Sequence, residues 1–437
     1  MFRYYVWLAL RSLRRNPALT GLMILAIGLG IGASMTMLTI FRAMSGDPIP
    51  LKSSQLFVPQ IDNIGPDHAK KDGEPPDMLS YTDARALMQA HAAPRQAAMY
   101  PTGFALTPTD PQLRPFKVEA RATYADFFSM FDVPFKYGGP WGANEDQARS
   151  DVIVIDSKLD DKLFGGANSV GKTINLDNHD YRIVGVLDQW TPQPRVYDVV
   201  NDKFGEIESV FLPFSRAIDQ QMPLWGNNEC AFDKAPDPGW EGHLASECVW
   251  IQFWAQLPDA GAEQRYKAFL DNYAAEQHRN GRFHWAPVTR LRNARQWLQY
   301  QHVVSDESRI LVVVSFSFLF VCLVNAVGLM LAKFMSRAAE TGIRRALGAN
   351  RRAVFAQCLV ETGVIGFAGG LLGLALTAAG LLGARAVLSK DATHLTHLDF
   401  TDVAIAVALA VIAAILAGLY PTWRAIQVQP AWQLKAN

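Results

Sequence analysis

The sequence predicts an α-helical membrane protein with four transmembrane helices and a large mixed α+β extracytoplasmic domain inserted between helices 1 and 2. Three observations predict this fold class. Half of the 437 residues are hydrophobic and only 19% are charged, against about 25% in a typical soluble domain. The apolar residues gather in four long uncharged runs. Basic residues flank these runs mainly on one side of the expected membrane, which is the pattern of cytoplasmic loops.

The four uncharged runs are long enough to cross a bilayer. They are Leu19–Phe41, Ile310–Ala332, Thr362–Ala384 and Val403–Trp423. A helix rises about 1.5 Å per residue and the hydrocarbon core is about 30 Å thick, so each run can span it. Core helices of a large soluble protein are the alternative, which four such runs disfavour. The first run is longer than the apolar core of a signal peptide, and no small-residue cleavage site follows Phe41, so we interpret it as a membrane anchor.

The charge distribution fixes the predicted topology. Arg11 and Arg15 precede the first run, many cations lie between Lys333 and Arg352, and Arg424 follows the fourth run. Positive charge stays in the cytoplasm, so both termini and the middle loop are expected inside. With 41 basic and 41 acidic residues, the chain shows no bias toward nucleic acid.

This topology divides the chain into eight predicted segments. They are 1–43 (cytoplasmic N-terminus and transmembrane helix 1), 44–305 (outer domain), 306–334 (helix 2), 335–355 (cytoplasmic loop), 356–388 (helix 3), 389–401 (outer loop), 402–423 (helix 4) and 424–437 (cytoplasmic tail).

Small residues line parts of the predicted spans. Such faces let helix backbones approach closely, either within the protein or against a second copy. The predicted helix-packing residues are Gly28, Gly32, Gly366, Gly369, Gly370 and Gly373. Two polar residues interrupt the spans, Asn325 and Glu361. They do not form an ion pathway, and Glu361 is expected to pair locally with Arg351 or Arg352.

The outer domain reads as alternating strands and helices. The expected elements are a strand at Val152–Ile155, a capped helix at Asp156–Phe164, a hairpin at Thr173–Val186, a strand at Val249–Gln256, a helix at Glu263–Arg279, a strand at Phe283–Val288 and a helix at Leu291–Val304 that runs into the second span. Cys230 and Cys248 lie in this domain. Thiols outside the cytoplasm tend to oxidise, so a disulfide between them is expected, with two unrelated thiols as the alternative.

One motif matches a nucleotide-binding phosphate loop letter for letter, Gly166 to Thr173. A true phosphate loop follows a strand and precedes a helix, whereas here a helix is expected before it and a strand after it. We therefore interpret the motif as a turn. No metal-binding or nucleophile motif is present in the sequence, so no catalytic residue, metal or cofactor is predicted.

The loop between the second and third runs resembles the cytoplasmic loop of the MacB/FtsX family of ABC transporter permeases. The resemblance rests on Glu340–Arg352, on the Gly-Gly-Leu-Leu-Gly run at Gly369–Gly373 and on the ending Tyr420–Ala425. In the outer domain, Leu163–Gly166 and Tyr181–Val186 are also similar to the family. The order of one span, a large outer domain and three spans matches over the whole chain.

The resemblance implies a permease without its own motor, because only 18 residues precede the first run. It implies a cytoplasmic ABC ATPase homodimer that hydrolyses magnesium-bound ATP, and a second permease copy or paralogue. A periplasmic membrane fusion protein, an outer-membrane channel and membrane lipid are further implied partners, with no nucleic acid. The implied location is the bacterial inner membrane. The residues expected to dock the ATPase are Glu340, Gly342, Ile343, Arg344, Arg345, Leu347 and Gly348.

The residues themselves support this docking surface and leave an alternative. Ile343 and Leu347 are four apart, so a short helix would place them on one face beside the paired arginines. Such a ridge fits a groove on an acidic partner, and it also fits an anionic lipid surface. By analogy with the family, closure of the ATPase dimer would produce a movement that the first two spans carry into the outer domain, a mechanism called mechanotransmission. The exported substrate would be a peptide, an antimicrobial or a lipoprotein. The rival function is an FtsX-type signal transmitter that regulates cell-wall hydrolases.

The family's outer domain has two lobes. We place the first lobe at about Leu51–Thr107 with Val249–Leu291, and the second, inserted lobe at about Thr109–Arg216. The region around Cys230 and Cys248 departs from the family pattern.

Overall fold

The computed structural model describes residues 7–8, 11, 15–65, 73–108, 113–230, 237–337, 342–343, 350–387 and 400–426. The chain divides into two compact units. One unit consists of Met1–Ser45 and Val304–Asn437, and the other of Gly46–Val303.

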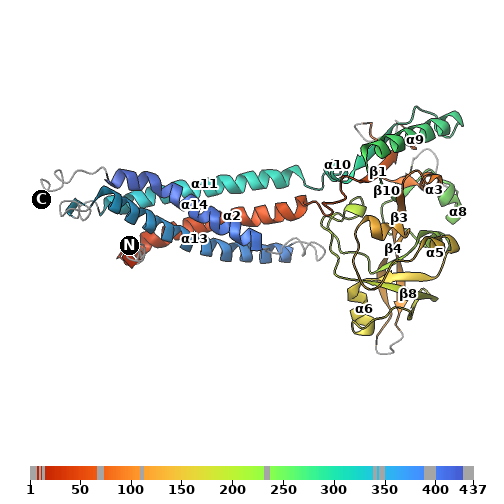
Figure 1. Ribbon diagram of the computed structural model, residues 1–437, viewed down its shortest axis with the longest axis horizontal. Helices are drawn as coiled ribbons and strands as arrows, with labels where there is room; N and C mark the ends of the chain where they lie inside the picture. Colours follow the sequence, from red (N-terminus) through yellow and green to blue (C-terminus); the bar gives the residue numbers. More distant parts are fainter. Residues whose placement is uncertain are drawn as a thin grey trace. The chain divides into compact units, whose positions relative to one another are not determined.

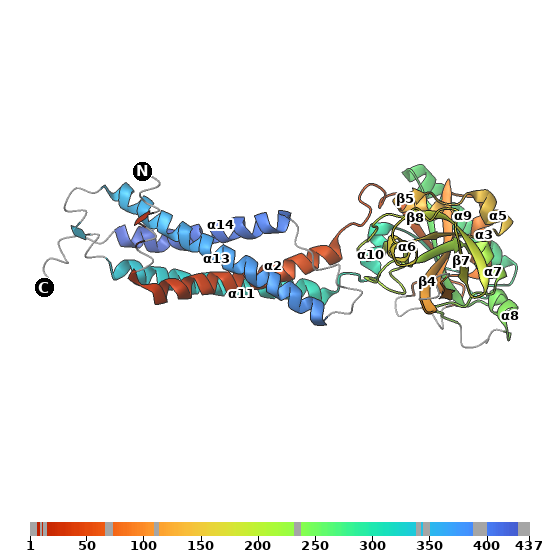
Figure 2. The same cartoon turned by 90° about the horizontal axis from the view of Figure 1, so that it is seen from below.

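The first unit is a bundle of long helices (Figure 1). Its described helices are α2 (Pro17–Ser45), α11 (Asp306–Met335), α13 (Arg351–Val387) and α14 (Phe400–Ile426). Helix α2 packs against α11 and α13, and α14 closes the ring from its other side by packing on both. Figure 2 shows α13 lying against α2. Within the described residues, α2, α11 and the part of α13 up to Ala384 are long and apolar enough to cross a membrane.

The bundle core follows helical periodicity. On α2 the fully buried residues Met23, Ile27, Ile31 and Met35 recur every four positions and face the other helices. This spacing produces one continuous apolar stripe. A polar contact joins the same helices, since the Ser34 hydroxyl donates to the carbonyl of Ser315 at 2.8 Å.

The second unit is built on one 11-stranded sheet with the order β11-β1-β10-β3-β4-β9-β6-β8-β5, in which β2 pairs with β10, and β7 with β3 and β8. The strands are β1 (Leu56–Ile61), β2 (Leu79–Ser80), β3 (Arg95–Thr107), β4 (Phe116–Thr123), β5 (Phe135–Gly138), β6 (Val152–Ile155), β7 (Thr173–Leu176), β8 (His179–Leu187), β9 (Val210–Pro213), β10 (Val249–Gln256) and β11 (Thr289–Asn293). Most pairs are antiparallel, and β4–β9 and β6–β8 are parallel.

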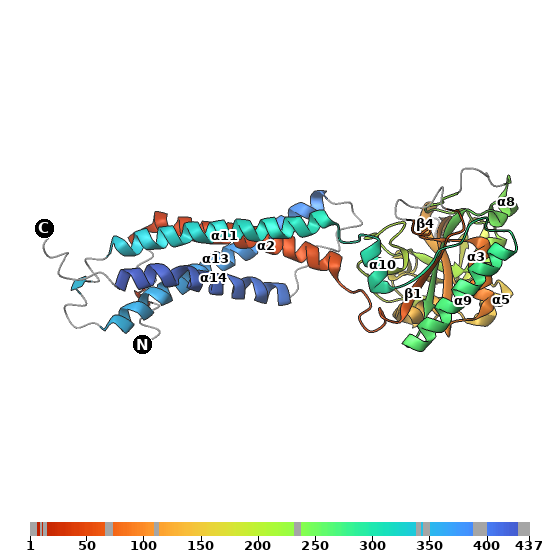
Figure 3. The ribbon, with the colours of Figure 1, turned by 90° about the horizontal axis from the view of Figure 1, so that it is seen from above.

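Helices cover both faces of this sheet, and a separate apolar core lies between the sheet and the helices on each face. One core includes residues from α3 (Tyr81–Ala90), α6 (Ser157–Phe164), α7 (Phe214–Asp219), α8 (Trp240–Ala245) and α9 (Ala260–Arg279). The other includes residues from α4 (Asp126–Met130), the 3-10 helix η1 (Val196–Asp198) and α10 (Ala294–Tyr300). The short helix α5 (Ala143–Ala148) completes the unit. Figure 3 shows α9 running along the sheet.

Strand β3 joins the two lobes that the family resemblance implies. Its first part, Arg95 to Met99, pairs with β10, and its second part, Tyr100 to Leu106, pairs with β4. The apolar cores also contain residues from both lobes. The lobes are therefore two halves of one sheet.

A closed network of charges is buried on one face of this sheet. Arg121 of β4 forms ion pairs with Asp198 and Glu208, and all three side chains are at most 2% exposed. Arg195 lies 3.4 Å from Glu208 and 3.5 Å from Asp198. The Tyr197 hydroxyl donates to Glu208 at 3.0 Å. Two cations thus face two anions, which is how buried charges are tolerated.

Several predicted elements agree closely with the structure. The strands β6 and β10 have the predicted bounds, and α6 is capped by Asp156, whose side chain accepts from the amide of Leu159 at 2.9 Å. The predicted hairpin is formed by β7 and β8, with Asp177 and Asn178 at positive φ in its turn.

Two predicted elements are wrong. Phe283 to Val288 forms no strand; Pro287 lacks an amide donor, and β11 begins only at Thr289. Leu291 to Val304 is not a continuous helix into the second span. The Asn293 side chain caps α10 by accepting from the amide of Gln296. Residues 301–305 are then non-helical, with His302 at a φ of 46°, and α11 starts only after the Ser305 cap.

Candidate functional site

The candidate site is the end of the helix bundle from which the predicted coupling loop leaves. Helix α11 ends at Met335 and α13 begins at Arg351, so these helices hold the two ends of the loop. Of the predicted docking residues, Gly342 and Ile343 are described. Ile343 is 59% exposed, as a docking side chain requires. The remaining ones, Glu340, Arg344, Arg345, Leu347 and Gly348, lie outside the described residues.

A buried ion pair joins the two helices at this end. The Lys333 Nζ of α11 lies 2.7 Å from a carboxylate oxygen of Glu361 on α13, and both side chains are at most 4% exposed. Arg337 approaches the same carboxylate at 3.7 Å. The Lys333 ammonium also donates to the hydroxyl of Thr20 on α2 at 3.3 Å. This Lys333–Glu361 pair therefore connects three helices.

The expected pairing of Glu361 with Arg351 or Arg352 is wrong. Those arginines stand nine and ten positions earlier on the same helix and are exposed. At about 1.5 Å of rise per residue, they are about 14–15 Å from Glu361 along the axis, beyond the reach of a side chain. In the sequence, Lys333 indicates only the topology, as one of the basic residues of the cytoplasmic loop. A lysine at the end of one apolar run and a glutamate at the start of the next could have indicated the pair.

The predicted small residues of α2 and α13 lie against one another. A Cβ added at Gly28 would lie 2.8 Å from Leu372, and one at Gly32 would lie 2.7 Å from Leu376. In the other direction, Gly369 and Gly373 receive the branched side chains of Ile27 and Ile31, respectively, at 2.7 and 2.8 Å from such a Cβ. Larger residues would push the helices apart. Gly366 and Gly370 are buried on α13 as well.

Helix α14 is fitted to the same end of the bundle. A Cβ at Gly418 would lie 2.3 Å from the Thr362 methyl group, and Thr362 directly follows Glu361. The Thr362 hydroxyl donates back to the Cys358 carbonyl at 3.0 Å, which fixes the rotamer of the threonine. All four helices therefore have close or polar contacts near the loop, so a displacement of the loop ends moves packed side chains in each of them.

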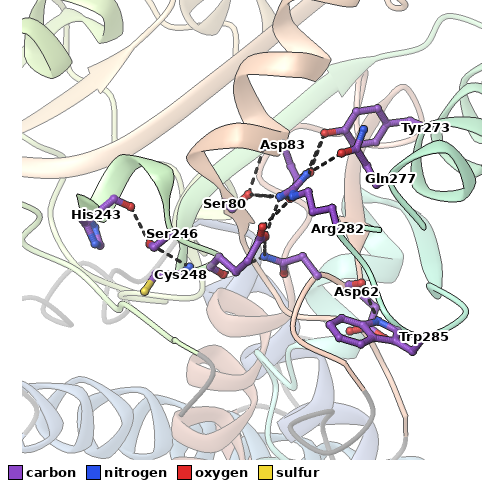
Figure 4. Close-up of polar contacts among 12 residues, drawn as sticks. Asp62, Ser80, Asp83, His243, Ser246, Cys248, Tyr273, Gln277, Arg282 and Trp285 are labelled. Carbon is purple, nitrogen blue, oxygen red and sulfur yellow. Dashed lines mark hydrogen bonds and ion pairs between the residues drawn. The ribbon is translucent and has the colours of Figure 1, made fainter. Parts of the chain in front are cut away.

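The second unit contains a polar network centred on Arg282 (Figure 4). Its guanidinium binds Asp83 at 2.6 Å and Glu247 at 2.7 Å, and it also donates to Ser80 at 3.2 Å. The Tyr273 hydroxyl donates to Asp83 at 2.8 Å. The network ties α3, α9 and the segment before β10 together. Asp83 is 199 positions from Arg282 and Glu247 is 35 positions from it, so no local sequence pattern indicates the network.

The segment before β10 also carries the disulfide. Cys230 and Cys248 are bonded to each other, and Cys248 is buried. The loop that the disulfide closes includes α8. Trp240 of α8 donates from its indole nitrogen to the carbonyl of Ile218 at 3.1 Å. Helix α8 also forms one wall of a groove of about 580 Å³, whose other walls are α3 and the end of α7.

We expect the Cys230→Ser, Cys248→Ser double variant to lower the stability of the second unit by about 3 kcal/mol, because the disulfide closes a loop of 18 residues in the unfolded chain. Thermal unfolding of the full chain with and without reductant measures the loss. Cys358→Ser removes an unpaired thiol from the bundle and is the matched control. If reductant leaves the wild-type transition unchanged, this account of the disulfide is wrong.

The phosphate-loop motif lies between a helix and a strand. Helix α6 ends at Phe164, Gly165, Gly166 and Gly171 have positive φ, and β7 begins at Thr173. The order of elements is the one predicted from the sequence and is the reverse of a phosphate loop. The Lys172 ammonium lies over the Phe164 ring, 4.4 Å from its centroid. In the part of the chain that the structure describes, no group of three metal-ligating side chains could hold a metal ion.

Comparison with known proteins gives two matching families. Residues 20–247 match the MacB-like periplasmic core domain, and residues 312–430 match the FtsX-like permease C-terminal region. The chain is 24% identical over 307 residues to the macrolide export ATP-binding/permease protein MacB of Bdellovibrio bacteriovorus, which covers 68% of this chain and 41% of that protein. It is 24% identical to the pyoverdine export ATP-binding/permease protein PvdT of Pseudomonas aeruginosa, over 71% of this chain and 41% of that protein.

Among solved structures, the periplasmic region of MacB from Actinobacillus actinomycetemcomitans matches 58% of this chain and 94% of that chain, with 11% identity and a TM-score of 0.37. The chain spans about two fifths of the length of the two export proteins named above, MacB and PvdT.

Proposed function

The chain belongs to the family of ABC transporter permeases that join a MacB-like periplasmic core domain to an FtsX-like permease region, and we propose that it is the permease subunit of a MacB-type transporter. In this role it couples ATP hydrolysis by a separate cytoplasmic ATPase to a conformational change of its outer domain. The observation that carries the proposal is the order of the two matched regions along the chain, with the candidate coupling loop inside the second.

We propose that α2, α11, α13 and α14 all cross the bacterial inner membrane. Both termini and the coupling loop then lie in the cytoplasm, and the second unit lies in the periplasm. The basic residues that flank the apolar runs support this orientation, since Arg11, Arg15, Lys333, Arg351 and Arg424 all fall on the same side.

The coupling loop is proposed to dock a homodimeric ATPase. Support comes from the exposed Ile343 and from the arginines that follow it in sequence, which suit an acidic groove. The Leu-Ser-Gly-Gly signature of ABC ATPases does not occur within these 437 residues. The Lys333–Glu361 pair holds the loop ends to the bundle, so force on the loop is transferred to α11 and α13. This movement then has to pass the non-helical residues 301–305.

The proposed activity is export of a substrate from the periplasmic face, such as a peptide, an antimicrobial or a lipoprotein. The similarity to relatives named for macrolide and pyoverdine export supports this class. A second permease copy or paralogue, a membrane fusion protein and an outer-membrane channel would complete the machine. An FtsX-type signal transmitter is the second candidate, favoured by the match of residues 312–430. A neighbouring gene for a cell-wall hydrolase would favour signalling, and one for a membrane fusion protein would favour export.

The docking proposal is tested by reversing the charge and polarity of the loop. We expect the Arg344→Glu, Leu347→Asp double variant to abolish co-purification of the ATPase, because it removes a cation and an apolar contact together. Arg279→Glu makes the same charge change at an exposed site of α9 and is the control. The full chain is purified from membranes and the bound ATPase is quantified. Retention of the ATPase by the double variant would contradict docking at this loop.

A further inference from the structure

Helix α11 presents an exposed face along its whole length. It is the least enclosed of the three long apolar helices. Val321 and Val324 are 54% and 53% exposed, and Gly328 has open space where a Cβ would lie. At about 100° per residue, Val321 and Gly328 lie within about 60° of Asn325 around the helix axis. Val321, Asn325 and Gly328 form what we call the α11 outer face.

Asn325 is the polar residue of this face. Its side chain is exposed, and none of the residues that the structure describes hydrogen-bonds to its amide. It stands four positions from the centre of the apolar run Ile310–Ala332, about 6 Å along the axis. The hydrocarbon half-thickness is about 15 Å, and the asparagine side chain is too short to reach the headgroups from that depth. An unpaired amide there is costly, because lipid tails offer no hydrogen bond.

A second copy of the same helix supplies the missing partner. The carboxamide has two donor hydrogens and one acceptor oxygen, so two asparagines related by a twofold axis can each donate to the other. Such an interface is self-complementary, as twofold contacts require. Gly328, almost one turn further on, presents no side chain and allows the two backbones to approach. Lipid contact alone would leave the amide without a partner.

We propose that the α11 outer face is the contact between two copies of this chain, with reciprocal hydrogen bonds between the Asn325 side chains at its centre. The inference rests on the proposed membrane span and names the surface through which the second permease copy binds. Ser317, which is also exposed and lies two turns before Val324, extends the polar and small character of the face.

Cysteine cross-linking in membranes tests the contact. The background carries Cys322→Ala and Cys358→Ala, which leaves the Cys230–Cys248 disulfide as the remaining cysteine pair. We expect Asn325→Cys and Gly328→Cys to form intermolecular disulfides on oxidation. Phe320→Cys is the matched control, since Phe320 is 67% exposed within the same apolar run but about 140° around the helix from Asn325. Equal cross-linking at positions 320 and 325 would overturn the proposal.

Substitution of the amide gives a second readout. We expect Asn325→Leu to weaken dimerisation about tenfold, as the loss of two interhelical hydrogen bonds does, whereas Asn325→Gln keeps the dimer. Val324→Leu is the neighbouring control. Dimer fraction is measured on the full chain in lipid nanodiscs across a range of protein-to-lipid ratios. An unchanged dimer fraction in Asn325→Leu, or a cross-linked product with the mass of a different permease, would overturn the contact between identical copies.

Failure of the span itself has a separate signature. If a membrane-impermeant maleimide modifies Asn325→Cys in unbroken membranes and in everted vesicles, the residue faces water and the proposed span is wrong. If the thiol is shielded but neither cross-links nor affects the dimer, the span holds and the interface is elsewhere.

Discussion

Glu361→Ala is expected to lower the stability of the helix bundle by about 3–5 kcal/mol, because it leaves the fully buried Lys333 ammonium without its carboxylate. The contact of Arg337 with the same carboxylate, at 3.7 Å, is lost at the same time. Lys333 belongs to α11 and also contacts Thr20 of α2. Loss of its attraction to Glu361 therefore loosens the contacts of both helices with α13. Thermal unfolding of the full chain in lipid nanodiscs measures the effect.

A double substitution separates the pair from its individual charges. Lys333→Met with Glu361→Leu replaces both partners by apolar residues of similar size, and we expect it to be more stable than Glu361→Ala. Asp306→Ala removes an exposed acid that pairs with Arg309 on α11, and should cost less than about 1 kcal/mol. A Glu361→Ala transition within one degree of wild type would mean that Lys333 is solvated and that the pair does not hold the loop-bearing end.

Arg121→Met is expected to destabilise the second unit by about 3–5 kcal/mol, because Asp198 and Glu208 then share a buried site with Arg195 alone. Urea unfolding of the full chain, followed by near-ultraviolet circular dichroism, measures this loss. The same substitution at Arg149, which is 58% exposed and pairs with Asp219, is the control and should cost less than about 1 kcal/mol. Similar losses at the two sites would contradict the special role of the buried network.

The network also sets a pH dependence. Burial alone would raise the pKa of Glu208, but the charges of Arg121 and Arg195 outweigh it and lower the pKa to about 2, from 4.5. A carboxylate with a depressed pKa in the folded state stabilises the protein above its unfolded value. This contribution is therefore complete above pH 4.5 and is lost as the pH falls toward 2. Arg121→Met should weaken this acid sensitivity, because Arg195 alone then opposes the effect of burial on the pKa of Glu208.

The sequence was informative where the determinants are local. The strand β10 is mostly apolar, with Gln252 as its one interior polar residue, and α6 is bounded by an aspartate cap and a glycine in the left-handed conformation. The predicted long helix from Leu291 failed because Asn293 and Ser305 each cap a new helix. Those caps are visible in the sequence, but they compete with a helical pattern that runs through them.

The buried ion pairs of the fold and of the site could not be predicted, because they depend on distant residues. The partners of Arg121 are 77 and 87 positions away, and Lys333 and Glu361 lie on different helices. These residues come close to one another only after the chain has folded, so a sequence pattern cannot identify the pairs. The glycines of α2 and α13 were identifiable by spacing, although the spacing does not say which helix would receive them.

The shared strand β3 has a consequence for the outer domain as a whole. Because one backbone of 13 residues hydrogen-bonds to β10 in its first half and to β4 in its second, a single-residue insertion in β3 shifts the register of one half against the other and turns alternate side chains to the wrong face. Cutting the chain there would leave two open edges, each prone to aggregate. Insertions in the loops of either lobe therefore leave the sheet intact, whereas neither lobe can be removed without breaking the strand that both share.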